Sequence, residues 1–138
     1  MNNNCIFCKI IAGEIPSATL YEDADFKAIM DIAPAAKGHV IILSKKHQAN
    51  LFELDDETAG KAILVARKLA KAIQEELQCD GINLLQNNGE AAGQTIFHFH
   101  MHLIPRFVGD QMMIPWDHKT YGEGEASALA AAIADRLK

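Results

Sequence analysis

Three histidines stand at alternate positions of one short apolar run, and this run carries the clearest chemical signal in the sequence. They are His98, His100 and His102, within residues 96–104. The run is rich in β-branched and aromatic residues, which predicts a strand. Because a strand points successive side chains to opposite faces, all three imidazoles should share one face. Imidazoles titrate near neutral pH and can act as nucleophile, acid, base or metal ligand.

The other face of the same strand is apolar and should anchor it in a core. It carries Phe97, Phe99, Met101 and Leu103. A single histidine on such a strand would most simply be a hydrogen-bonded core residue. Three buried histidines on one face would each need polar partners, because burying an unpaired polar group costs free energy of folding. Such an arrangement is therefore expected only where it serves a function. The triad therefore predicts a catalytic or ligand-binding site.

Two cysteines near the N-terminus, Cys5 and Cys8, have the spacing of a zinc knuckle, in which two thiolates take two corners of a tetrahedron. The sequence holds no second pair of this kind, so the other ligands would be histidines, with His47 and one triad histidine as candidates. A redox pair is the alternative, but the strand before and the helix after that a thioredoxin-like motif needs are missing. Cys79, at the end of a predicted helix, is interpreted as a packed thiol.

Residues 87–95 are mostly small and polar and lead directly into the triad strand. Glycines in such a loop let backbone N–H groups turn towards an anion such as phosphate, and Gln94 and Thr95 add side-chain donors. By itself the segment would be read as an ordinary connection, and its place beside three histidines favours a phosphate site. The glycine patterns of P-loops and dinucleotide-binding folds are absent, and so is a carboxylate cluster for magnesium.

Periodicity and turn residues predict a single domain over residues 1–138, of the α+β class, with a mainly antiparallel sheet. Strands are expected at residues 19–21, 26–31, 39–43, 82–86 and 96–104, and helices at 5–12, about 55–77 and 126–137. The longest helix should begin at the acidic cap Asp55, which suits the positive end of the helix dipole. Its expected core face consists of Ile63, Ala66, Leu69, Ala70, Ile73 and Leu77.

The composition limits the classes of partner. The chain has 138 residues and a formal net charge of -5, which argues against a nucleic-acid partner. No stretch approaches the ~20 apolar residues of a membrane span, and the first residues lack the pattern of a signal peptide. With three cysteines, an odd number, and no export signal, we expect a cytoplasmic protein with metal-bound or free thiols and no membrane partner.

The run from His98 to Ile104 resembles the signature of the histidine triad (HIT) nucleotide-binding family, whose triad histidines alternate in the same way. The resemblance continues, in the right order, over residues 5–16, 31–34, 38–40, 45–47, 87–89 and 93–95, and it is closest to the bacterial zinc-binding members. From about Phe107 onward the match is poor. That tail varies within the family and helps to set substrate preference.

The resemblance implies a five-stranded antiparallel sheet with one long helix and a C-terminal helix. It also implies a symmetric homodimer, with the long helix and the strand at residues 82–86 at the two-fold interface. His100 would be the nucleophile that attacks the α-phosphorus of a purine nucleoside phosphoramidate or related nucleotide. Water would then hydrolyse the nucleotidyl-histidine. His102 and His39 would neutralise phosphate charge or assist proton transfer at the leaving group.

The resemblance also assigns a nucleotide pocket. Asp31 would accept hydrogen bonds from the ribose, Gln94 and Thr95 would hold phosphate oxygens, and Asn87 would orient the phosphate or the central histidine. The base would lie between apolar side chains, namely Phe7, Ile10, Phe26 and Ile32. Because such a slot reads a purine mainly by stacking, base selectivity should be modest.

For the metal, the resemblance implies one structural zinc ion, with Cys5, Cys8, His47 and His98 as its four ligands. Four protein ligands leave no open position for a substrate. The ion would tie the N-terminal segment to the triad strand.

Three other functions stay open from the sequence. The same scaffold could act as a dinucleoside polyphosphate hydrolase or nucleotidyltransferase, which leaving-group preference would distinguish. It could also be a nucleotide-binding regulatory module with incidental hydrolysis. An open catalytic zinc site at the triad is disfavoured, because it leaves the loop at Gln94 and Thr95 unexplained.

Overall fold

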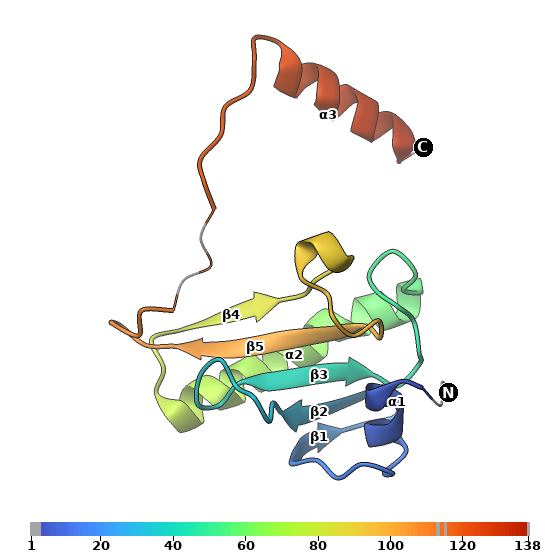
Figure 1. The fold of residues 1–138 in the computed structure, drawn as a ribbon, viewed down its shortest axis with the longest axis vertical. Coiled ribbons are helices and arrows are strands. Elements are labelled where there is room, and N and C mark those ends of the chain that lie inside the picture. The colour runs from blue at the N-terminus through green and yellow to red at the C-terminus, as the bar shows by residue number, and fades with distance from the viewer. Residues whose placement is uncertain (1–3, 113, 115, 138) are drawn as a thin grey trace.

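The computed structural model describes residues 4–112, 114 and 116–137 (Figure 1). Five antiparallel strands form one sheet in the order β1-β2-β3-β5-β4. The strands are β1 (Thr19–Glu22), β2 (Phe26–Met30), β3 (Val40–Ser44), β4 (Gly81–Leu85) and β5 (His100–Arg106). The helices are α1 (Ile6–Ile11), α2 (Asp56–Leu77), the 3-10 turn η1 (Glu90–Ala92) and α3 (Glu125–Arg136). The predicted α+β fold, with one long and one C-terminal helix, is confirmed.

The sheet separates two apolar clusters. The larger lies between the sheet and α2, and includes Phe26, Ala28, Val40, Ile42, Leu69, Ile73, Met101 and Leu103. The smaller lies between the sheet and α1, and includes Cys5, Phe7, Cys8, Ile10, Ile29, Ile41 and Leu43. Figure 1 shows α2 and α1 against opposite faces of the sheet. Successive side chains along β2 and β3 point to opposite faces of the sheet, so only every second side chain can reach the site on the α1 side.

α2 begins as the sequence predicts. The carboxylate of Asp55 caps the helix by accepting a hydrogen bond from the Thr58 N–H at 2.7 Å, and it also pairs with Lys46 at 3.0 Å. Most of the expected core face packs against the sheet. The prediction that Ile63 belongs to this face is wrong, because its side chain is 55% exposed. Ile63 lies on the flank of the helix, 100° round the axis from the buried Ala62, and the sheet does not cover it.

The triad strand begins later than predicted. β5 starts at His100, and residues 96–98 form a bend before it. The Phe99 N–H donates to the Gln48 carbonyl at 2.7 Å, which draws this segment towards the chain that follows β3. Phe97 is therefore 46% exposed, and the prediction that it packs in the core is wrong. The bend separates His98 from the two histidines that remain on the strand.

Beyond β5, residues 107–124 contain neither helix nor strand among those the structure describes, and they lead to α3. α3 stands apart from the rest of the molecule in Figure 1. Within the described part of the chain, no helix is both long and apolar enough to cross a membrane.

Candidate active site and metal centre

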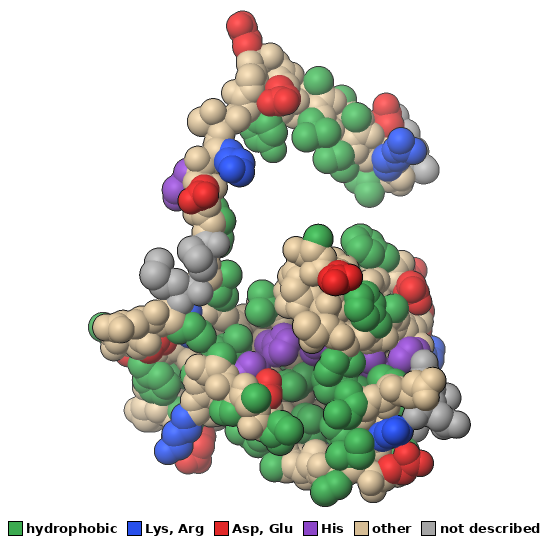
Figure 2. Space-filling model, in the orientation of Figure 1, with side chains coloured by type: hydrophobic (Ala, Val, Ile, Leu, Met, Phe, Trp, Pro, Cys, Tyr) green, Lys and Arg blue, Asp and Glu red, His purple; other side chains and the backbone are tan. Residues whose placement is uncertain are grey.

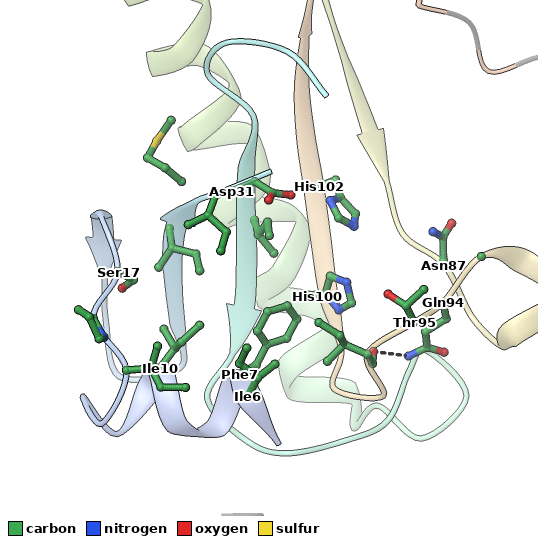
Figure 3. Close-up of a pocket in the computed structure, with 18 residues that line it drawn as sticks. Ile6, Phe7, Ile10, Ser17, Asp31, Asn87, Gln94, Thr95, His100 and His102 are labelled. Atoms are coloured by element: carbon green, nitrogen blue, oxygen red, sulfur yellow. Dashed lines mark hydrogen bonds between the residues drawn. The ribbon is translucent and has the colours of Figure 1, made fainter. Parts of the chain in front are cut away.

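A cavity of about 300 Å³ lies on the α1 side of the sheet, between α1, the end of β2, β5 and the loop at residues 87–96 (Figure 3). Its apolar wall includes Ile6, Phe7, Ile10, Ile29, Ile41 and Ile96. Its polar residues include Asp31, Asn87, Thr95, His100 and His102. In Figure 2 the histidines are visible in a hollow of the surface. The arrangement suits a ligand with one apolar, stackable part and one anionic part.

The state of His100 is fixed by the backbone of the bend. Its Nδ1 lies 2.6 Å from the carbonyl oxygen of His98, so Nδ1 carries the proton and donates it. Nε2 of the neutral ring is then an unprotonated nitrogen with a free lone pair. Burial lowers the pKa of His100 below its ordinary value of 6.5, although this hydrogen bond and Asp31 act in the opposite direction. His100 therefore presents a neutral ring with an unprotonated nitrogen at the cavity wall, which is the form of imidazole that can act as a nucleophile.

His39 and His102 form a short hydrogen-bonded chain with a single consistent direction. The Ala35 N–H donates to Nδ1 of His39 at 3.0 Å, so a neutral His39 must carry its proton on Nε2. That nitrogen lies 2.9 Å from Nδ1 of His102 and donates to it. His102 consequently carries its own proton on Nε2, as a donor available to an anion. Burial lowers the pKa of both rings, that of His102 to about 4.

Asp31 completes this corner of the cavity. Its Oδ2 lies 3.5 Å from Nε2 of His39, and its Oδ1 accepts a hydrogen bond from the Ala33 N–H at 2.8 Å. Asp31, His39 and His102 lie close enough to hold a metal ion together. However, the 2.9 Å separation between the two imidazole nitrogens is a hydrogen-bond distance, and it accounts for both rings without a metal.

The loop before β5 differs from expectation at Gln94. This side chain is buried, and its Nε2 donates to the carbonyls of Ala49 at 2.7 Å and Ile96 at 3.1 Å. Its Oε1 accepts from the Gly89 N–H at 2.8 Å. Both amide hydrogens are thus already used, so the side chain shapes the loop and is not a free donor for phosphate. Thr95 and Asn87 line the cavity as predicted (Figure 3).

Two of the four residues expected around the base need comment. Phe7 and Ile10 line the cavity, and Ile32 lies at its rim with its side chain 98% exposed. The prediction that Phe26 lines the base pocket is wrong, because this side chain is fully buried in the cluster on the α2 side. Strand alternation places Ile29 on the cavity side instead, a residue that the sequence analysis did not predict.

The four predicted metal ligands converge. Nδ1 of His98 lies 3.4 Å from Sγ of Cys5 and 3.5 Å from Sγ of Cys8. Nδ1 of His47 lies 3.2 Å from both Sγ of Cys8 and Nδ1 of His98. Zinc bonds of ~2.0–2.1 Å to nitrogen and ~2.3 Å to sulfur put neighbouring ligand atoms of a tetrahedron roughly 3.3–3.8 Å apart. The cluster could therefore hold a metal ion of this kind.

Local structure explains why the ligands meet. Cys5 is the N-cap of α1, and its Sγ accepts a hydrogen bond from the Cys8 N–H at 3.4 Å, so one helical turn presents both sulfurs. Nε2 of His98 lies 2.6 Å from the Ser44 carbonyl and donates to it, which leaves its Nδ1 lone pair directed at the cluster. Such a hydrogen bond to the second nitrogen is typical of histidines that bind metals.

Comparison with known proteins places this site among relatives. A family model described as "HIT domain" matches residues 12–109. The chain is 45% identical to Protein hit of Bacillus subtilis, over 97% of this chain and 94% of that protein. It is 38% identical to the adenosine 5'-monophosphoramidase hnt1 of Schizosaccharomyces pombe, over 98% and 99% of the two chains.

Solved structures agree with the fold over nearly the full length. A Streptococcus mutans protein has 39% identity and a TM-score of 0.95, covering 100% of this chain and 88% of its own. A HIT family member from Bacillus subtilis has 43% identity and a TM-score of 0.93, covering 99% of both chains. A zinc-bound histidine triad family protein from Mycobacterium smegmatis has 36% identity and a TM-score of 0.76, covering 97% of both.

The hydrogen-bonded chain gives a pH prediction. Titration of the ring signals by NMR should show His102 neutral at pH 6, with a midpoint near 4, because burial and the neighbouring His100 and His39 disfavour its charged form. The carboxylate of Asp31 raises the pKa of His39 against the effect of burial. Asp31→Asn should therefore lower the His39 midpoint further. A titration midpoint of His102 at or above 6.5 would contradict the neutral, hydrogen-bonded pair of His39 and His102.

Proposed function

This chain belongs to the HIT family, and from that premise we propose that it hydrolyses purine nucleoside phosphoramidates and related nucleotides at the α-phosphorus. The observation that carries the proposal is the 2.6 Å hydrogen bond from Nδ1 of His100 to the carbonyl of His98. It leaves Nε2 of His100 unprotonated beside a cavity with one apolar and one polar side. The relative from Schizosaccharomyces pombe, an adenosine 5'-monophosphoramidase, supports the choice of substrate class.

The proposed reaction consists of two displacements. Nε2 of His100 attacks the α-phosphorus, a P–N bond to the enzyme forms, and the substrate's bond to its amine breaks as the amine takes up a proton from solvent. Water then attacks the same phosphorus, loses a proton to solvent and breaks the bond to Nε2, which releases the nucleotide and restores the neutral ring. Because the imidazole is a good leaving group, one difficult displacement becomes two easier ones.

The neighbouring residues stabilise charge on phosphorus in this proposal. Nε2–H of His102 donates to a phosphate oxygen, and His39 holds His102 in the tautomer that makes this possible. Thr95 and the backbone of the loop shaped by Gln94 hold the other oxygens. Asp31, at the end of β2, accepts the ribose hydroxyls, and Asn87 orients the phosphate.

The apolar wall suits a stacked base. Phe7 on α1 packs edge-on against His100, with 4.9 Å between ring centroids, so the base slot and the nucleophile share one wall. Ile10 and Ile29 extend this wall, and Ile32 covers its rim. With few polar groups on this side, selectivity among purines should be modest.

His100→Ala should bind adenosine 5'-phosphoramidate but lose at least about a thousandfold in kcat, because no other group replaces the nucleophile. The same substitution at His118, an exposed histidine outside the cavity, is the matched control and should leave kcat unchanged. Steady-state kinetics and acid-quenched mass spectrometry would detect turnover and an adenylyl group on His100. Wild-type kcat in purified, folded His100→Ala would exclude this residue as the nucleophile.

We also propose that the Cys/His cluster binds one zinc ion with a structural role. A donor set of two thiolates and two imidazoles matches zinc, and the zinc-bound relative from Mycobacterium smegmatis supports this choice. When bound, the ion cross-links α1 to the segment before β5. Two ligands come from α1, namely its N-cap Cys5 and Cys8. The third, His98, comes from the bend before β5, and the fourth, His47, comes from the segment after β3.

Elemental analysis of protein prepared without chelators should find about one zinc per chain. Cys8→Ser should lose the metal and lower Tm, because a hydroxyl is a poor zinc ligand and the cross-link is broken. Cys79→Ser makes the same change at a buried cysteine outside the cluster and should keep the metal. Metal-free native protein in which Cys8→Ser costs no more stability than Cys79→Ser would exclude the site.

Finally, we propose a homodimer formed through α2 and β4. β4 pairs only with β5 among the described strands, so its outer edge is open. Leu84 on this strand and Ile63 on the adjacent flank of α2 are 45% and 55% exposed. Burial of apolar side chains beside an open strand edge favours association through that edge.

Sedimentation at micromolar concentration should give a species of twice the chain mass of 15.1 kDa. Ile63→Asp should shift the equilibrium towards the monomer, because it places a charge in the apolar interface. Glu75→Asp, on the exposed outer face of the same helix, is the control and should leave the mass unchanged. A wild-type monomer under these conditions would refute the proposed interface.

A further inference from the structure

One lysine, Lys27, is buried among apolar side chains on the α1 side of the sheet, and the proposed reaction does not use it. It belongs to β2, and only 9% of it is exposed. Strand alternation places it on the same face as Ile29, which is part of the apolar cluster under α1. Burying an ammonium group costs free energy, and an apolar side chain of the same length would avoid that cost. The position of Lys27 therefore requires a specific partner.

That partner is the backbone of α1. Nζ of Lys27 donates a hydrogen bond to the carbonyl oxygen of Ile10 at 3.2 Å. The carboxylate opposite Lys27 in the register of β1 and β2 belongs to Glu22, and it is already paired with Lys45 at 2.9 Å. A cationic side chain that binds the last carbonyls of a helix stabilises that end. The contact thus fixes the C-terminal turn of α1 on the strand beneath it.

The Ile10 carbonyl lies where α1 leads into a second part of the cavity wall. α1 ends one residue later, Gly13 turns the chain with a φ of +82°, and residues 15–17 line the cavity again. Figure 3 shows α1 and Ser17 on the side of the cavity opposite the loop that carries Thr95. The lysine therefore holds the junction between both parts of the apolar wall.

α1 needs such an anchor because it is short. A helix of six residues forms too few internal hydrogen bonds to be stable alone in water. At its start it is held by the cluster that includes Cys5 and Cys8. Between its ends, Phe7 and Ile10 pack in the apolar cluster on the sheet. Apolar contacts have no preferred direction, so they allow the helix to slide or rotate, and the Lys27 hydrogen bond fixes its position.

We propose that Lys27 is a positioning residue for the nucleobase, because its hydrogen bond to Ile10 holds α1 and residues 15–17 in the shape of the base slot. The inference rests on the proposed function for the place of the base. Lys27 does not line the cavity, so it acts through Ile10 and not on the substrate itself. Since the His98 carbonyl sets the tautomer of His100, chemistry at phosphorus should not depend on Lys27.

The test compares a ligand that has a base with one that lacks it. Lys27→Met removes the donor and keeps an unbranched side chain of similar length. It should weaken the binding of adenosine 5'-monophosphate at least about tenfold, because the base slot loses its shape. Binding of ribose 5-phosphate, which has the phosphate but no base, should stay within about twofold of wild type. With adenosine 5'-phosphoramidate, KM should rise while kcat stays within about twofold.

Hydrogen exchange reports the route of the effect without any turnover. In Lys27→Met, the amides of residues 9–13 should exchange faster, while those of α2 keep their wild-type protection. Lys71→Met makes the same change at an exposed lysine of α2 and should leave binding, kinetics and exchange unchanged. Lys27→Arg keeps a cationic donor at the site and should bind adenosine 5'-monophosphate more tightly than Lys27→Met.

Each other outcome overturns the proposal. Equal losses for the two ligands would mean that Lys27 acts on the anion through its charge. Weaker nucleotide binding without faster exchange in α1 would mean that the effect does not pass through the helix. Unchanged nucleotide binding would mean that the contact with Ile10 is dispensable, and failure of Lys27→Met to fold would mean that the lysine serves the whole fold.

The proposed function fails in a different way. An absence of hydrolysis by the wild-type chain would contradict the proposed function alone, since the binding and exchange measurements need no turnover. A wild-type chain that binds adenosine 5'-monophosphate no more tightly than ribose 5-phosphate would contradict the base slot, and with it the role of Lys27.

Discussion

The site depends on the position of one residue, His98, which makes three directed contacts. Its Nε2 donates to the Ser44 carbonyl at the end of β3, its Nδ1 faces the cysteine sulfurs, and its own carbonyl accepts the proton of His100. The side chain therefore belongs to the cluster of Cys5, Cys8 and His47 that could hold a metal, while the backbone sets the tautomer of His100. A shift of this residue would alter both sites together.

Burial supplies the second condition for the chemistry, because it keeps the imidazoles neutral. It lowers the pKa of His39, His100 and His102, and the hydrogen bonds then decide which nitrogen of each neutral ring bears the proton. α1 contributes to this enclosure, since Phe7 packs edge-on against both His98 and His100. A helix of six residues is thus tied to the site both by an aromatic contact and by the cysteines at its start.

Sequence patterns predicted the elements well because hydrophobic periodicity and capping residues act locally. The cap at Asp55 and the alternation of the β5 residues from His100 onward are examples. The errors have non-local causes. Phe26 was assigned to the base slot, although the pairing of β2 with β3 turns it towards α2, and Gln94 was assigned to phosphate, although distant backbone carbonyls take up its amide.

The bend at residues 96–98 has the same kind of cause. The local sequence is that of a strand, but the contacts of His98 with Ser44 and the cysteines, and of Phe99 with Gln48, come from segments far away in sequence. The place of α3 could not be read from the sequence either, because helical periodicity predicts the helix but does not predict that none of its residues is buried.

The central claim, a covalent intermediate on His100, is tested most directly by stereochemistry. A substrate analogue made chiral at the α-phosphorus by one sulfur atom would be cleaved in oxygen-18 water, and the configuration of the product would be determined. Two in-line displacements, first by Nε2 of His100 and then by water, predict retention of configuration. Inversion would mean that water attacks the substrate directly, and it would contradict the account.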